Sequence, residues 1–227
     1  YVNAHIREIL NRQINNFIAQ TKNDLFAIRS SANCEDGVNR AWAGQFNSFL
    51  NTQKSEIKNR IKSCYASVFS PGVFYYSLRN SQVEKSIEMA VILQEMIPAE
   101  ISGVCFTTNP ISGNKNEIMI EFCEGLGVPL VSSQIVPHMY IINKTYSTIV
   151  EYRCGTQKRV MRYGENSEIL DVNTPLQVKS RELTKSQIEK IVEMAMILEN
   201  IFETAQDFEW TLVGTELTVV QSRNITT

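Results

Sequence analysis

The order of hydrophobic and polar residues predicts three amphipathic helices. In the first twenty residues the apolar side chains fall mostly on one helical face. A second helix is predicted to begin at Ser55, as its N-cap, and to end before Pro71-Gly72. The third is the best defined, because Thr184 and Gln187 have capping-box spacing ahead of an apolar stripe that ends at Phe202.

Short apolar runs with the composition of strands lie among these helices. The run LFAI ends in Arg29, and the later runs are MAVILQEM, SGVCFTT, EIMIEF, MYIINK and TIVEY. A last pair, DFEWTLV and ELTVVQSR, flanks Gly214-Thr215 and predicts a β-hairpin. Because the strands form a block and do not alternate with helices, this order favours an α+β fold over a doubly wound sheet.

Composition and charge narrow the class of protein. The chain has 227 residues, of which 43% are hydrophobic, so it can bury a core as one large domain or two lobes. A net charge of −2 provides no global attraction to nucleic acid or membrane, and no apolar run has the length of a membrane helix. The five cysteines are scattered without a C-x-x-C pair, which is typical of reduced thiols. We therefore expect a cytoplasmic protein.

A polar stretch at about residues 153–183 has the weakest periodicity and contains a small basic cluster. Its members are Arg153, Lys158, Arg159 and Arg162. No aromatic residues are interleaved with them in the manner of a nucleic-acid surface. The favoured interpretation is the solvated face of a β-ribbon, with nucleic-acid binding as the weaker alternative.

Several common catalytic motifs are missing. The sequence contains neither a P-loop nor a G-x-G-x-x-G fingerprint, so neither of these phosphate-binding loops is predicted. With His5 and His138 as its two histidines, the chain is a poor candidate for Ser-His-Asp chemistry. We expect both histidines to lie at the surface.

Polar clusters nevertheless follow several predicted strands. Arginine binds phosphate oxygens through two parallel hydrogen bonds, so Arg29 is a candidate phosphate ligand, although pairing with Glu35 or Asp36 explains it equally well. In the predicted hairpin Gln221 and Arg223 differ by two positions and share a face. With Glu209 on the neighbouring strand, they offer oxygen ligands for Mg²⁺ and a phosphate contact. An ordinary polar hairpin face explains each of them singly.

Taken together and in order, these stretches resemble the nucleotide-binding domain of phosphoenolpyruvate synthase and pyruvate phosphate dikinase, which rifampicin phosphotransferase and the glucan water dikinases share. The motifs are IRSSANCED with AGQF, LQEMI, SGVCFTTNP, EGLG, and DFEW followed by VVQSR. The resemblance implies an ATP-grasp-like fold of mixed and antiparallel sheets with packed helices. It also implies an ATP-dependent phosphotransferase that passes a phosphoryl group to a histidine of a swivelling domain, and then to an acceptor such as pyruvate.

The resemblance further implies roles for single residues. Arg29 is expected to be the catalytic arginine on the phosphates. Adenine is expected to bind a hinge formed by Gln94, Glu95, Met96 and Ile97.

The same resemblance implies the cofactors ATP and Mg²⁺. Glu209 and Gln221 are the expected metal ligands, and Arg223 is the expected second phosphate contact.

The resemblance also predicts partners and domain limits. Residues 1–24 are expected to be a helix remaining from an incomplete first lobe, and residues 25–227 an ATP-grasp-type domain with a more variable β segment at about 145–183. The expected partners are ATP, the missing lobe and the phosphohistidine domain, so the isolated chain is expected to be inactive.

Val128 and Ser77 stand where the family carries charged residues. These departures support an alternative, a degenerate nucleotide-binding or regulatory module without catalysis.

Overall fold

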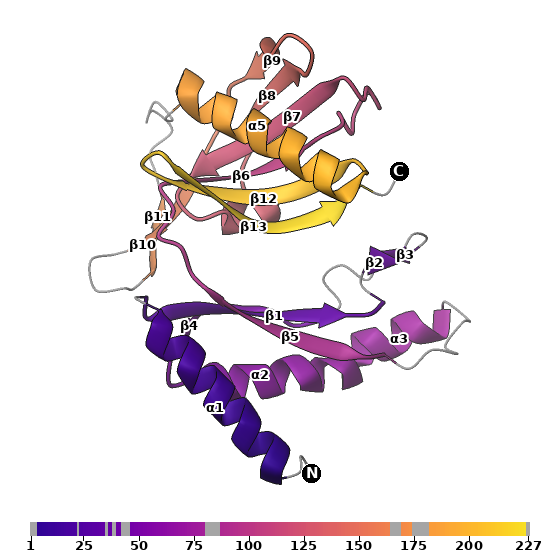
Figure 1. The fold of residues 1–227 in the computed structure, drawn as a ribbon, viewed down its shortest axis with the longest axis vertical. Coiled ribbons are helices and arrows are strands. Elements are labelled where there is room, and N and C mark those ends of the chain that lie inside the picture. Colours follow the sequence, from indigo (N-terminus) through magenta and orange to yellow (C-terminus); the bar gives the residue numbers. More distant parts are fainter. Residues whose placement is uncertain are drawn as a thin grey trace. The chain divides into compact units, whose positions relative to one another are not determined.

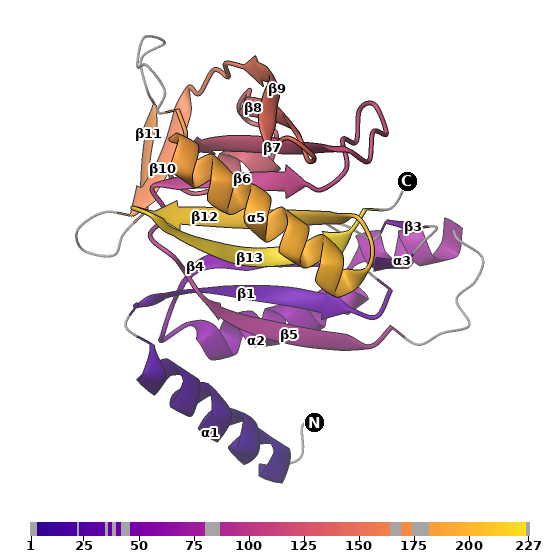
Figure 2. The same ribbon diagram turned by 45° about the horizontal axis from the view of Figure 1, so that its top comes forward.

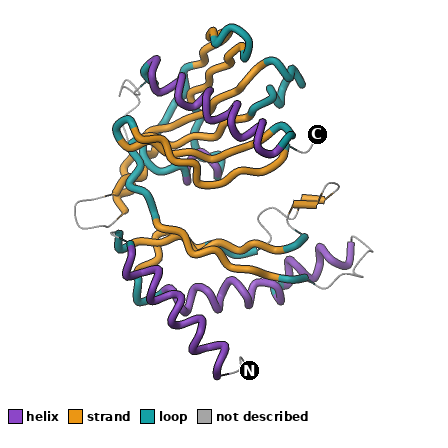
Figure 3. The backbone as a smooth tube through the Cα atoms, viewed as in Figure 1, coloured by secondary structure: helices purple, strands orange, loops and turns teal. Residues whose placement is uncertain are grey.

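A computed structural model describes residues 4–21, 23–34, 36–37, 40–41, 46–79, 87–163, 169–173 and 182–225. The chain forms two compact units, Tyr1–Ile97 and Pro98–Thr227, each built from antiparallel sheet and helices (Figures 1 and 3). This arrangement confirms the predicted α+β class. Within the described part of the chain, no helix combines the length and the apolar character needed to cross a membrane.

Among its described residues, the first unit contains a three-stranded sheet, a short two-stranded pairing and three α-helices. Its elements are α1 (Ala4–Gln20), β1 (Leu25–Ala32), β2 (Asp36–Gly37), β3 (Arg40–Ala41), β4 (Phe49–Gln53), α2 (Ile57–Ala66), the 3₁₀ turn η1 (Ser67–Phe69), α3 (Pro71–Arg79) and β5 (Met89–Glu95). The sheet order is β4-β1-β5, with both pairings antiparallel. β5 therefore lies at an edge of this sheet.

One face of this sheet packs against helices. Phe26 and Ile28 of β1 are fully buried and contact Ile57 and Cys64 of α2, with apolar residues of α1 around them. Figure 1 shows α1 and α2 on the same side of β1 and β5. Because side chains alternate along a strand, the odd-numbered residues of β1 point to the opposite face.

The second predicted helix begins one residue later than expected, and with its η1 turn it ends before Pro71-Gly72, as expected. It begins after Glu56, which makes no side-chain cap, and not after Ser55. Glu56 already has helical dihedrals, and its N–H donates to Gln53 O in a turn, so Ser55 lies outside the capping position. Beyond the η1 turn a further helix begins at Pro71, because proline suits the first turn, where its missing N–H costs nothing.

The second unit contains a six-stranded antiparallel sheet. Its elements are β6 (Ile101–Phe106), β7 (Glu117–Glu124), α4 (Val128–Val131), β8 (His138–Asn143), β9 (Thr148–Arg153), β10 (Arg159–Tyr163), β11 (Ile169–Asn173), α5 (Lys185–Phe202), β12 (Gln206–Val213) and β13 (Glu216–Asn224). The strand order is β13-β12-β6-β7-β8-β9. The predicted hairpin is confirmed as β12–β13, and Gly214 in its turn has a φ of +59°.

Helix α5 lies across one face of this sheet (Figure 2). The capping box is confirmed: Thr184 Oγ1 accepts from Gln187 N–H, while Gln187 Oε1 accepts from Thr184 N–H. Trp210 and Phe208 of β12 are buried in the core beneath the helix. Consequently Glu209, which lies between them in the sequence, points to the opposite face of the sheet, which we call the open face.

The polar segment near residue 160 forms the ribbon β10–β11. Three members of its basic cluster are paired with acidic residues. These ion pairs are Arg153–Glu151, Arg159–Asp171 and Arg162–Glu124. The pairing neutralises much of the positive charge that a nucleic-acid surface would need.

His138 is buried, so the surface position expected for it was wrong, whereas His5 is exposed as expected. The His138 ring stacks against Phe122, and its Nδ1 lies 3.0 Å from the Tyr152 hydroxyl. The N–H of Gly155 donates to the same Nδ1. Burial lowers the pKa of His138, because the charged ring is less well solvated within this stack.

Candidate functional site

Arg29 and Gln94 come together on the face of the first sheet that the helices leave open. β1 and β5 pair in a register that places Ala27 opposite Gln94 and Arg29 opposite Ile92. Arg29 Nη1 donates to Gln94 Oε1 at 3.5 Å. These two predicted site residues are therefore neighbours, one on each of two paired strands.

The segment predicted as an adenine hinge is held by residues that precede β1. The N–H of Met96 donates to Leu25 O at 3.0 Å, and Asn23 Nδ2 donates to Met96 O at 2.8 Å. The N–H of Asn23 donates to the carboxylate of Glu95 at 3.1 Å. Both main-chain polar groups of Met96 are thus engaged within the protein.

The planar peptide bond then fixes the direction of the neighbouring groups. In a trans peptide the C=O of one residue and the N–H of the next point in opposite directions. Because Met96 N–H points to Leu25, the C=O of Glu95 points away from β1. Because Met96 O points to Asn23, the N–H of Ile97 also points away from that segment. The outer edge of β5 therefore ends in an acceptor from Glu95 followed by a donor from Ile97.

Some predicted features fall outside the described residues. Glu35 is not described, nor is the side chain of Asp36, so the alternative pairing of Arg29 with them stays open. Much of the AGQF motif and the side chain of Ser77 are likewise outside the description. The assignment of residues 1–24 to a separate lobe stays a prediction.

In the second unit Glu209, Gln221 and Arg223 share the open face of the six-stranded sheet. Glu209 pairs directly with Gln221 across β12–β13, and Asp207 pairs with Arg223 two residues along the strands, on the same face. A bulge follows Glu209, but it lies beyond these pairs and leaves their register intact. Directly opposed residues in such a ladder have Cβ atoms about 5 Å apart, within reach of one shared ligand.

Asp207 lies on the same face, although the sequence motifs did not single it out as a candidate. Its Oδ2 lies 3.5 Å from Arg223 Nη2, whereas within the described structure its buried Oδ1 has no hydrogen-bond partner. Burial raises the pKa of Asp207, and the nearby Arg223 opposes that shift. The two-residue spacing to Glu209 in DFEW was the signal that placed both carboxylates on one face.

Glu121 of β7 lies on the same face and in the same transverse row. Its register partner Val104 pairs in turn with Glu209, so one strand separates the two glutamates. Burial raises the pKa of Glu121. The open face therefore carries more acidic side chains than the hairpin alone suggested.

The donor set suits a hard cation that keeps other oxygen ligands. Glu209 and Gln221 offer a carboxylate and an amide oxygen, which are ligands that Mg²⁺ accepts. No cluster of three or more His, Cys, Asp and Glu side chains with metal-binding geometry exists among the described residues. The residues thus fit an ion that takes its remaining ligands from phosphates and water, and do not fit an all-protein cage.

Two motifs have structural roles. In SGVCFTTNP, the buried Thr107 accepts from the N–H of Gln206 through its hydroxyl, which ties the end of β6 to the start of β12. In EGLG, Gly125 has a φ of +77°, and a side chain there would collide with the carbonyl of Met161. The N–H of Leu126 donates to that same carbonyl at 2.7 Å, so the turn is docked on β10.

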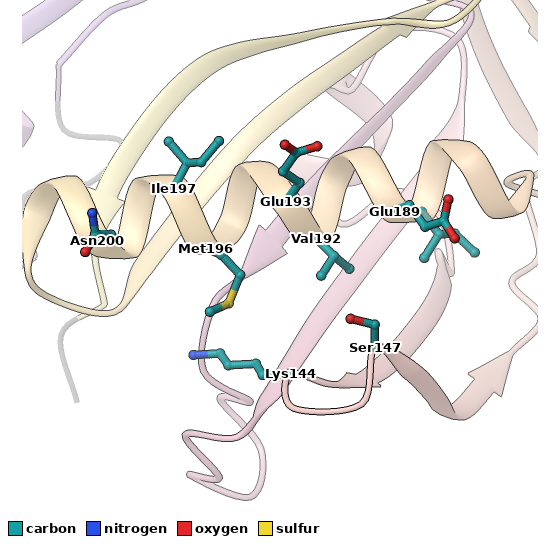
Figure 4. A pocket seen from close by; sticks show the side chains of 9 residues that line it. Lys144, Ser147, Glu189, Val192, Glu193, Met196, Ile197 and Asn200 are labelled. Atoms are coloured by element: carbon teal, nitrogen blue, oxygen red, sulfur yellow. The ribbon is translucent and has the colours of Figure 1, made fainter.

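A cavity of about 470 Å³ lies away from these residues (Figure 4). It is formed between α5 and the turn after β8, where Met196 extends toward Lys144. Lys144 Nζ is held by the Glu199 carboxylate at 2.6 Å. Because α5 covers the face opposite Glu209, this cavity is not part of the open face.

Comparison with known proteins matches the whole chain, residues 1–227, to the family model described as pyruvate phosphate dikinase, AMP/ATP-binding domain. A probable phosphoenolpyruvate synthase of Archaeoglobus fulgidus is 33% identical over 202 residues, covering 88% of this chain and 27% of that protein. A rifampicin phosphotransferase of Bacillus cereus is 35% identical over 205 residues, covering 89% and 23% respectively.

A solved structure was also matched, the D-alanine–D-alanine ligase of Helicobacter pylori, with a TM-score of 0.39 and 10% identity over 93% of this chain and 46% of that chain. The chain spans about a quarter of the length of the relatives named above. With every residue from 1 to 227 matched, the chain belongs to the family of AMP/ATP-binding domains of pyruvate phosphate dikinase.

Proposed function

We propose that this chain binds ATP with Mg²⁺ as the nucleotide-binding part of a phosphotransferase. The phosphoryl group passes to a histidine of a swivelling domain, and from there to an acceptor such as pyruvate. The observation that carries the proposal is the pairing of Glu209 with Gln221 beside Arg223 on one open sheet face. Family membership and the phosphotransferases among the relatives support it.

Each site residue has a role that follows from its chemistry. Arg29 and Arg223 neutralise phosphate oxygens, since a guanidinium presents a planar fork that matches them. Glu209 and Gln221 would hold Mg²⁺, which supplies charge neutralisation at the phosphates when bound. Gln94 to Ile97 hold the base, largely through main-chain groups at the edge of β5. The protein's contribution is thus positioning and electrostatic stabilisation.

The domain is expected to transfer phosphate only when a first lobe and a histidine domain are supplied. The test is to incubate it with ATP labelled at the β- or the γ-phosphate, Mg²⁺, and the first lobe and swivelling domain of a relative. We expect β-labelled ATP to leave an acid-labile, base-stable label on the histidine. This label should be lost in Glu209→Gln. Nucleotide binding without any label would overturn transfer and leave a binding module.

A further inference from the structure

The hinge predicted from LQEMI is held in place by a residue outside that motif. Asn23 makes two hydrogen bonds to it, from its side-chain amide to Met96 O and from its N–H to the carboxylate of Glu95. Met96 N–H is held separately by Leu25 O. The two peptide units on either side of Met96 are therefore fixed by different partners.

This difference in partners has a chemical consequence. The peptide between Glu95 and Met96 is held by the β1–β5 ladder, which continues through seven further residue pairs. The peptide between Met96 and Ile97 lies beyond the strand and has Asn23 as the partner of its carbonyl. Rotating that second peptide would exchange Ile97 N–H for Met96 C=O at the outer edge.

We propose that Asn23 is a positioning residue that sets the base specificity of the nucleotide site. Resting on the proposed function, the inference is that Asn23 holds the Met96–Ile97 peptide so that Glu95 C=O and Ile97 N–H face the base. Adenine presents a donor at its 6-amino group and an acceptor at N1, which complement that order. A 6-oxopurine presents an acceptor at its 6-oxygen and a donor at N1–H. The 6-oxygen would face the acceptor Glu95 C=O, and N1–H would face the donor Ile97 N–H, so neither hydrogen bond could form.

The sharpest probes are nucleotides that differ at these two atoms alone. Inosine triphosphate replaces the 6-amino group of ATP by oxygen and carries a hydrogen on N1. The 1-deaza analogue of ATP keeps the amino group and lacks the N1 acceptor. With the full-length protein and Mg²⁺, calorimetry should give at least about tenfold tighter binding of ATP than of either analogue, the effect of one lost or reversed hydrogen bond.

The informative variant is Asn23→Asp, which keeps the size and shape but replaces the amide donor by an acceptor that repels Met96 O. The ATP-to-inosine triphosphate preference should fall about tenfold, and the penalty for removing N1 should largely disappear. Asn23→Ala, which adds no charge, should shift the preference in the same direction. The matched control is Asn59→Asp on the exposed side of α2, which should keep the wild-type preference.

A general loss of folding would weaken the binding of all three nucleotides equally, whereas the proposal requires the ratios of their affinities to change. Unchanged ratios in Asn23→Asp and Asn23→Ala, with ATP still bound, would overturn the role of Asn23 and leave the proposed function standing. If the wild-type protein binds none of the three nucleotides, the proposed function and this inference are overturned together.

Discussion

The two units present the groups that we propose bind nucleotide in different ways. In the second unit the groups are side chains placed by the two-residue period of β12 and β13 over a large buried core. In the first unit the groups of the proposed hinge are main-chain atoms, whose direction is set by Asn23 and Leu25. A periodic side-chain pattern can be read from a sequence, whereas the direction of a peptide group cannot. A local motif therefore specifies where the side chains of the hairpin point, whereas a contact remote in sequence specifies where the peptide groups point.

The two units also differ in charge. The open face of the second sheet carries Asp207, Glu209 and Glu121, with Arg223 beside them. On the first sheet the corresponding charged group is Arg29, which contacts the neutral Gln94. By its chemistry the acidic set suits a cation, whereas Arg29 suits phosphate oxygens.

The largest effect is expected from Gly103→Ala in β6. A Cβ there would collide with the ring of Trp210 and with the carbonyl of Glu121, neither of which is a flexible chain end. We expect a loss of about 3 kcal/mol in the unfolding free energy of the second unit, measured by urea denaturation. Gly214→Ala is the control: its φ is +59° but nothing lies within 4 Å, so a cost of about 1 kcal/mol is expected. Equal costs at the two positions would show that packing at Gly103 does not support the sheet.

The next effect concerns the proposed metal ligands. Glu209→Gln keeps the shape of the side chain and removes its charge, so binding of ATP with Mg²⁺ should weaken about 100-fold, at the upper end of what disturbing a metal site costs. Binding of ATP in the presence of a chelator should change little. Calorimetry under both conditions gives the comparison, with Glu216→Gln at the exposed start of β13 as the matched control. An equal loss with and without Mg²⁺ would remove Glu209 from the metal site.

The hairpin shows how much of the site was predictable. Glu209, Gln221 and Arg223 were placed on one face from the two-residue period and the position of Gly214, and the register of β12–β13 confirms that geometry. Their roles as ligands stay predictions. The ion pair of Asp207 was not predicted, because it depends on which strand residue faces Arg223.

The first unit shows why other features escaped prediction. Asn23 lies in a short connecting segment, and nothing local indicates that its amide meets a carbonyl 73 residues away. Helix α3 was missed because Pro71-Gly72 was interpreted as a stop, while proline is also favoured at a helix start. The burial of His138 depends on an aromatic stack drawn from three strands. Each miss involves long-range contacts or an ambiguous local signal.

A smaller effect is expected on the first sheet. Arg29→Lys replaces a planar fork by a point charge, so ATP binding should weaken about tenfold. Gln94→Ala should cost about twofold, because the hinge is expected to bind through its main chain and Arg29 retains its charge. The control is Arg7→Lys on the exposed side of α1. If Gln94→Ala weakened ATP binding more than Arg29→Lys did, the assignment of Arg29 as the phosphate contact and of Gln94 as a neighbour of the hinge would be wrong.

The smallest effect concerns Asp207 and its dependence on pH. Burial raises the pKa of this carboxyl above its ordinary value of 3.8, so the folded protein holds the proton more tightly than the unfolded chain does. Between the unfolded and the folded pKa the native state therefore binds more protons, and the contribution of Asp207 to stability falls as pH rises through that window. Asp207→Asn stays neutral and avoids this loss.

We expect the thermal midpoint of Asp207→Asn to exceed that of the wild type by a few degrees at pH 7, and the difference to vanish as pH falls below about 4. Arg223 remains in place and partly solvated, so losing its partner should cost little by comparison. A variant less stable than the wild type at pH 7, by an amount that does not change with pH, would mean that the ion pair with Arg223 outweighs burial.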